Sequence, residues 1–151
     1  MDPRFAALTD RLAPKLKKLL EALRYGELPL DMPEKGIYLY SRGKKHLYIG
    51  RSNVLRKRYY RHFQSKYGAT FAFLLARKAT GRHTPAYQKG ADSREGLLSD
   101  PAFAEAIRTA KLQMREMDYR YVEETDQVRQ TLLEVYCAVV LQTPFNDFGT
   151  H

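Results

Sequence analysis

Tyr38 and Tyr48 lie ten residues apart, in the tripeptides Gly-Ile-Tyr (36–38) and Tyr-Ile-Gly (48–50), and an arginine-rich stretch follows. A phenol can orient or deprotonate a water molecule only if nearby positive charge lowers the pKa of the phenol. Arginine holds phosphate oxygens through a forked pair of hydrogen bonds. Two phenols beside several guanidinium groups therefore predict a site where a phosphate is held and attacked, although strand tyrosines more commonly pack or line a surface.

Arg58 and His62 are four residues apart, so they would be neighbours on one face of a helix. That face borders an expected buried stripe made by Leu55, Tyr59 and Phe63. A histidine in this place can pass a proton or hydrogen-bond a phosphate. Considered alone, His62 is more readily explained as a surface residue, but its position after Arg58 favours a catalytic role.

Glu134 is the one carboxylate in the apolar segment 131–141. A helix that is apolar around nearly its full circumference is expected to be buried. A carboxylate there is unfavourable unless it is paired or bound to a metal. The alternatives are a salt bridge to a core arginine and a site for Mg²⁺ (or Mn²⁺), an ion that keeps several waters and takes few protein ligands.

Positive charge is concentrated in the middle of the chain. The whole chain has a formal net charge of +9, and residues 35–91 contain 14 Lys and Arg with no Asp or Glu. Such a basic region is typical of a surface that binds nucleic acid, although solvated basic faces without a ligand also occur. An anionic membrane surface is a weaker alternative, because the basic residues do not follow one amphipathic helix. The residues expected to contact nucleic acid are Lys44, Lys45, Arg51, Arg56, Lys57 and Arg61.

Length and composition indicate a single globular domain. The chain has 151 residues, of which 44% are hydrophobic, and no apolar run approaches the roughly 20 residues that span a bilayer. The N-terminus lacks the apolar stretch of a signal peptide. One cysteine, Cys137, excludes an internal disulfide. These features predict a cytoplasmic protein with no membrane partner.

In the first half of the chain, residues 4–24 have helical spacing with Pro14 inside, which predicts two short helices or a kinked one. Residues 26–33 are expected to form a connector. Two strands follow, with Ile37, Leu39, Leu47 and Ile49 facing the core and a turn over residues 41–44. Because side chains alternate along a strand, Tyr38, Tyr40 and Tyr48 are expected to share the opposite face. A helix should then run from Ser52 or Asn53 to Gln64.

In the second half, a helix is expected over 71–76, a long loop over 79–99, and a helix from Asp100-Pro101 to about Met114. A third strand is expected over 117–122, and a helix from Thr125 or Asp126 to Leu141. The pattern predicts an α/β (α+β) fold: a small, mostly antiparallel three-stranded sheet flanked by helices. The expected organisation is one compact unit, with an N-terminal helical extension (1–34) before the main domain (35–151).

Taken together, these residues resemble the GIY-YIG nuclease superfamily. The resemblance is close over residues 36–63 and resumes at Glu134 and Asn146. It implies the GIY-YIG nuclease fold and an active site formed by Tyr38, Tyr48, Arg58, Glu134 and Asn146. His62 is similar to a position that is histidine or tyrosine in several members, and Arg51 to one that is lysine or another polar residue. The C-terminal segment and the long middle insertion look more like the restriction-endonuclease branch.

The resemblance implies a divalent-metal-dependent endonuclease that hydrolyses phosphodiester bonds in DNA. Glu134 would hold the metal, and Tyr38 would act as the general base or position the water, helped by Tyr48 or His62. Arg58 would neutralise charge on the phosphate, and Asn146 would fix the local geometry. Specificity would come from the insertion, the N-terminal helices, a homodimer or a partner protein.

Two other classes of function remain open at this stage. A nucleic-acid-binding module on the same fold that does not cleave would use the same basic stretch and exposed aromatic side chains. A protein-interaction subunit would use the leucine-rich N-terminus to pair with another helix.

Overall fold

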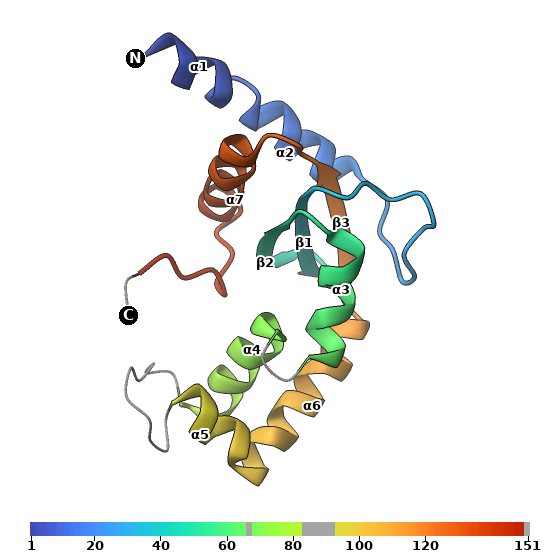
Figure 1. The fold of residues 1–151 in the computed structure, drawn as a ribbon. Coiled ribbons are helices and arrows are strands. Elements are labelled where there is room, and N and C mark those ends of the chain that lie inside the picture. Colours follow the sequence, from blue (N-terminus) through green and yellow to red (C-terminus); the bar gives the residue numbers. More distant parts are fainter. Residues whose placement is uncertain (66–67, 83–92, 150–151) are drawn as a thin grey trace. The chain divides into compact units, whose positions relative to one another are not determined.

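The computed structural model describes residues 1–65, 68–82 and 93–149. The fold is α+β, with helices flanking a three-stranded antiparallel sheet, which confirms the predicted class (Figure 1). The chain divides into two compact units, one made of Met1–Arg58 with Met117–Asn146 and the other of Tyr59–Glu116 with Asp147–His151. The boundary expected at residue 34 falls inside the first unit.

The first unit begins with two helices, α1 (Pro3–Thr9) and α2 (Leu12–Glu21). The prediction of two short helices is therefore correct, but the break does not lie at Pro14. Pro14 is the third residue of α2, in the first turn, where a backbone N–H has no partner within the helix and its loss does no harm.

The sheet contains β1 (Gly36–Arg42), β2 (Lys45–Ser52) and β3 (Asp118–Glu123) in the order β2-β1-β3. β1 pairs in antiparallel register with both neighbours, and β2 is an edge strand. A two-residue turn joins β1 to β2, and its Gly43 has a positive φ of 58°. Glycine adopts this conformation without steric cost, which explains the tight hairpin.

One face of the sheet supports the core of the first unit. Ile37, Leu39 and Ile49 pack there against two helices, α2 and α7 (Gln127–Leu141), which lie side by side (Figure 1). These three residues were predicted to face the core. Leu47, predicted with them, is buried but lies outside this cluster, because the pairing of β1 with β2 shifts by one residue there. The helical side chains of the cluster are Leu12, Leu16, Leu19, Leu133 and Cys137.

The opposite face is made of tyrosines, as the alternation of the strands predicted. Tyr38 packs against Tyr119 of β3 with ring centroids 5.6 Å apart, and Tyr40 lies 5.1 Å from the same ring. The tyrosines of this face are buried, and Tyr38 is only 1% exposed. Large rings on three adjacent strands cover one another.

Gly36 permits the close pairing of β1 with β3. A Cβ atom at this position would lie 2.1 Å from the backbone oxygen of Val122, well inside van der Waals contact. Any side chain would therefore push the two strands apart. The first glycine of the Gly-Ile-Tyr tripeptide is thus needed for the sheet that carries Tyr38.

Helix α7 is less buried than the sequence predicted. Asp126 caps it, its carboxylate accepting a hydrogen bond from Arg129 N at 2.8 Å, as predicted. However, Val135 and Val139 are 40% and 66% exposed, so the helix is not enclosed on all sides. The first unit covers α7 only from the side of the sheet, α1 and α2.

Helix α3 (Leu55–Gln64) follows β2, and the division between the two units falls within it, after Arg58. The second unit contains α4 (Thr70–Thr80), α5 (Arg94–Ser99) and α6 (Pro101–Arg115). Phe73 of α4 packs edge-on against Phe103 of α6 at 5.2 Å.

Part of the loop predicted over residues 79–99 is helical. The six residues of α5 form a helix capped by Ser93, which accepts a hydrogen bond from Gly96 N at 3.0 Å. Residues 83–92 of that predicted loop lie outside the described residues. Across the described ranges, no helix is both long and apolar enough to cross a lipid bilayer.

Candidate active site

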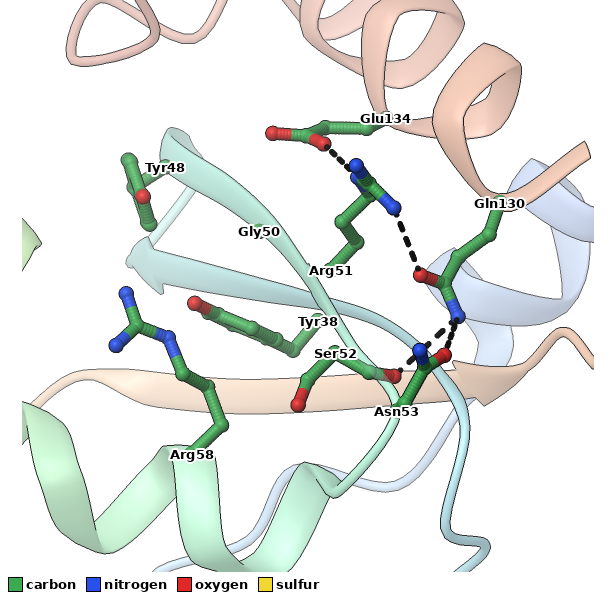
Figure 2. A pocket seen from close by; sticks show the side chains of 9 residues that line it. All are labelled: Tyr38, Tyr48, Gly50, Arg51, Ser52, Asn53, Arg58, Gln130 and Glu134. Atoms are coloured by element: carbon green, nitrogen blue, oxygen red, sulfur yellow. Dashed lines mark hydrogen bonds and ion pairs between the residues drawn. The ribbon is translucent and has the colours of Figure 1, made fainter. Parts of the chain in front are cut away.

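A polar pocket of about 440 Å³ lies at the β2 edge of the first unit. Figure 2 shows its side chains converging from the hairpin, from the start of α3 and from α7. It contains Tyr38, Tyr48, Arg51, Arg58 and Glu134, five of the residues singled out from the sequence. The full lining is Tyr38, Tyr48, Gly50, Arg51, Ser52, Asn53, Arg58, Gln130 and Glu134.

Tyr38 is seated in the pocket by Gly50, its partner across the hairpin. A Cβ atom on Gly50 would lie 2.2 Å from the Tyr38 hydroxyl oxygen, so only glycine leaves room for the phenol. Tyr48 lies diagonally across the strands, with its ring 6.3 Å from that of Tyr38. Gly50, the last residue of the Tyr-Ile-Gly tripeptide, therefore determines where the Tyr38 hydroxyl points.

Arg58 reaches the two phenols from the first turns of α3 (Figure 2). Its guanidinium lies close enough to Tyr38 and Tyr48 for its charge to act on both phenols. Even so, burial raises the pKa of Tyr38 above the usual range for a phenol, the neighbouring Tyr48 adds to the rise, and Arg58 opposes it only in part. Burial also raises the pKa of Tyr48. The expectation that positive charge lowers the pKa of these phenols is wrong, because desolvation outweighs it.

Glu134 projects from α7 into the pocket and pairs with Arg51 of β2. Its Oε2 atom lies 3.1 Å from Arg51 Nε, and Figure 2 shows the other carboxylate oxygen turned away from the guanidinium. The Glu134 side chain is 23% exposed and that of Arg51 is 41% exposed. Burial raises the pKa of Glu134, and Arg51 opposes the rise. The salt bridge considered from the sequence thus exists, but its arginine comes from an edge strand at the surface and not from the core.

A network of amide side chains, not foreseen from the sequence, supports this ion pair. Gln130 is 1% exposed, and its Oε1 accepts a hydrogen bond from Arg51 Nη1 at 3.3 Å. Asn53 and Gln127 exchange two hydrogen bonds, at 2.8 and 2.7 Å. Gln127, Gln130 and Glu134 are spaced three and four residues apart, which places them on one face of α7. That spacing is the signal by which the network could have been found.

Asn146 lies beside the pocket without lining it. Its Oδ1 accepts a hydrogen bond from Ile49 N at 2.8 Å, and its Nδ2 donates one to Ile49 O at 2.8 Å. Thr143 Oγ1 also donates to Asn146 Oδ1 at 2.8 Å. Asn146 thereby completes the hydrogen bonding of β2 on its outer edge, between Tyr48 and Gly50, and acts as a positioning residue.

His62 and Arg61 belong to the second unit, whereas all the residues that line the pocket belong to the first. His62 is fully buried, whereas the residue considered alone was expected at the surface. Arg61 is exposed.

Among the other basic residues predicted to contact nucleic acid, Lys44, Lys45 and Lys57 are exposed. Arg56 is only partly exposed, and its guanidinium donates a hydrogen bond to the backbone oxygen of Pro29 in the connector.

Among the described residues that line the pocket, Glu134 is the only carboxylate. Over the described parts of the chain, no group of three or more His, Cys, Asp or Glu side chains could hold a metal ion. A site built here around a cation would therefore rely on one carboxylate, with water completing the coordination. Mg²⁺ accepts such an arrangement, whereas a structural zinc site needs a full set of protein ligands.

We predict that Asn146→Ala exposes the outer edge of β2. Loss of the paired hydrogen bonds to Ile49 should lower the free energy of unfolding by about 1–3 kcal/mol. Hydrogen exchange followed by NMR should show a faster rate for the Ile49 amide, whereas the Tyr48 and Gly50 amides, which point toward β1, keep slower exchange. An unchanged rate at Ile49 would contradict the positioning role.

Comparisons of this chain with protein-family profiles, with curated proteins and with solved structures found no match. The residues of the pocket and their geometry are therefore the basis for assigning a function.

Proposed function

We propose that the chain is a divalent-metal-dependent endonuclease that hydrolyses phosphodiester bonds in DNA, and that it is a member of the GIY-YIG nuclease superfamily. The observation that supports this most is the convergence of two phenols, two guanidinium groups and one carboxylate in a single pocket. Binding a phosphate requires only the guanidinium groups. The carboxylate and the phenols are the additional groups that hydrolysis would use.

Glu134 would hold the metal ion, because its chemistry and setting fit a Mg²⁺ or Mn²⁺ ion. It is the pocket's carboxylate, and one of its oxygens is turned away from Arg51 (Figure 2). An ion bound there would supply positive charge to the scissile phosphate and to the leaving oxygen.

The protein's own cations would bind the phosphodiester. Arg58 stands at the phenols and Arg51 at the carboxylate, so the two guanidinium groups can contact different oxygens of one phosphate. Arg58 lies against the phenols before a substrate arrives, and such preorganised charge stabilises the negative charge that develops during attack.

Tyr38 would position the attacking water, with help from Tyr48. Burial raises the pKa of Tyr38, so its hydroxyl stays protonated at neutral pH and both donates and accepts hydrogen bonds. A buried neutral phenol is better suited to orienting a water than to removing its proton. The structure therefore favours, of the two roles considered for Tyr38, the positioning one.

DNA is the proposed substrate because the basic residues of the stretch 35–91 would contact a polyanion. Lys44, Lys45 and Lys57 are exposed in the first unit and would contact further phosphates of the same polyanion. One pocket cuts one strand, so a double-strand break would need a homodimer or a partner protein.

The alternative is a nucleic-acid-binding module that does not cleave. The specific observation in its favour is that Arg51 already compensates the charge of Glu134, so the carboxylate needs no metal ion to be accommodated. The two functions differ in whether a divalent ion and Glu134 are required for a chemical step.

We predict that Glu134→Gln abolishes cleavage of supercoiled plasmid in Mg²⁺ while DNA binding is retained. The substitution keeps the size of the side chain and removes the charge that would hold the ion. EDTA should abolish cleavage by the wild type in the same assay. Glu21→Gln, an exposed glutamate of α2 that pairs with Lys17, is the matched control and should cleave normally.

Cleavage by Glu134→Gln at the wild-type rate would refute the metal-binding role of Glu134. Salt-sensitive DNA binding by a folded wild type that never cuts DNA in Mg²⁺ or Mn²⁺ would instead favour the binding module.

We predict that Tyr38→Phe reduces the single-turnover cleavage rate by roughly a hundredfold, because the attacking water loses the hydroxyl that would orient it. Tyr119→Phe is the matched control, because Tyr119 packs on the same ring but does not line the pocket. A loss of only about twofold in Tyr38→Phe, or an equal loss in both variants, would remove Tyr38 from the reaction.

A further inference from the structure

Arg51 and Glu134 form an ion pair with each other. The proposed function, however, needs Arg51 to bind a phosphate and Glu134 to bind a metal ion. Arg51 Nε lies 3.1 Å from Glu134 Oε2, which is the distance of a charge-assisted hydrogen bond. A phosphodiester would draw the guanidinium away from this carboxylate, and a divalent cation would draw the carboxylate away from the guanidinium. The inference below rests on the proposed function and concerns its regulation.

The position of Arg51 is built into the fold. Gln130 holds the guanidinium at a second point, through Nη1 to Oε1 at 3.3 Å. The orientation of the Gln130 amide is in turn fixed, since its Nε2 donates to backbone and side-chain oxygens of the surrounding segments. These acceptors are Ser52 O at 3.3 Å, Asn53 Oδ1 at 3.2 Å and Glu124 O at 3.2 Å.

Arg51 is nevertheless able to leave. Its side chain is 41% exposed, and it lines the same pocket as Arg58. A guanidinium at the surface gives up little free energy when it exchanges one oxygen partner for another, because an exposed ion pair contributes little to stability. The ion pair of Arg51 with Glu134 therefore has favourable geometry but contributes little free energy.

A divalent cation on Glu134 would compete with the Arg51 guanidinium for the charge of one carboxylate. Mg²⁺ binds carboxylate oxygens at about 2.0–2.1 Å and brings its own shell of waters. Two positive groups on one carboxylate also repel each other, and the described lining residues include no second acidic side chain to reduce that repulsion.

We propose that Arg51 is an exchangeable counterion: it occupies Glu134 when no cation is bound, and a divalent cation that takes Glu134 releases Arg51 to bind the phosphodiester of the substrate. Cation and DNA then bind with positive coupling, because each favours the arrangement in which Arg51 has left Glu134. The pocket acquires its full affinity for the phosphate only when the cation is present.

The first test measures the affinity of the protein for Mn²⁺ alone, by the electron paramagnetic resonance signal of the free ion. Arg51→Ala should bind Mn²⁺ more tightly than the wild type, on the order of tenfold, because a competing and repelling charge is gone. Lys17→Ala is the matched control: it also removes a cation paired to a carboxylate of the first unit, and it should leave the affinity unchanged. Glu134→Gln should lose the site.

Two outcomes distinguish a failure of the Arg51 exchange from a failure of the proposed function. Binding by the wild type that depends on Glu134, but is no tighter in Arg51→Ala, would overturn the exchange and leave the metal site in place. Absence of Mn²⁺ binding in the wild type and in Arg51→Ala would refute the metal-dependent function itself, and the exchange with it.

The second test measures DNA affinity in EDTA. Glu134→Gln should tighten binding by roughly threefold in the wild-type background, because Arg51 is released, and should have no such effect in the Arg51→Ala background. Equal tightening in both backgrounds would show a simple loss of negative charge and would contradict the release of Arg51.

Discussion

The packing of Tyr38 against Gly50 across the hairpin is the constraint on which the pocket depends. Only a glycine at position 50 lets the phenol lie over β2, and the close pairing of β1 with β3 at Gly36 fixes the strand that carries it. Asn146 closes the outer edge of β2 between Tyr48 and Gly50. The pocket is thus built on paired backbone, which holds reacting groups more rigidly than a loop would.

Desolvation and charge act against each other throughout the pocket. Burial raises the pKa of Tyr38, Tyr48 and Glu134, and Arg58 and Arg51 oppose these shifts without reversing them. The phenols consequently stay neutral, and the carboxylate keeps a cationic partner. Under the proposed function, the two guanidinium groups would attract the phosphodiester, the carboxylate would attract the divalent ion, and the neutral hydroxyls would orient the attacking water.

Local patterns in the sequence predicted the parts of the fold that depend on local rules. Alternation placed Ile37, Leu39 and Ile49 on one face and the tyrosines on the other, and Asp126 marked the start of α7. Local patterns could not predict the features that depend on contacts between distant segments. The burial of the tyrosines needs β3 to pair beside β1, the partner of Glu134 comes from β2, and Asn146 acts on Ile49, 97 residues away. Helix α5 was missed because its six residues contain a glycine and lie in a polar stretch.

The most direct test of the account is a crystal structure of the protein grown with Mn²⁺, in which anomalous scattering locates the ion. The account predicts a peak at the Glu134 carboxylate, on the wall of the pocket that also holds Tyr38 and Arg58, with the Arg51 guanidinium displaced from its present partner. Crystals saturated with Mn²⁺ that show no peak at Glu134, and an Arg51–Glu134 pair still intact, would contradict it.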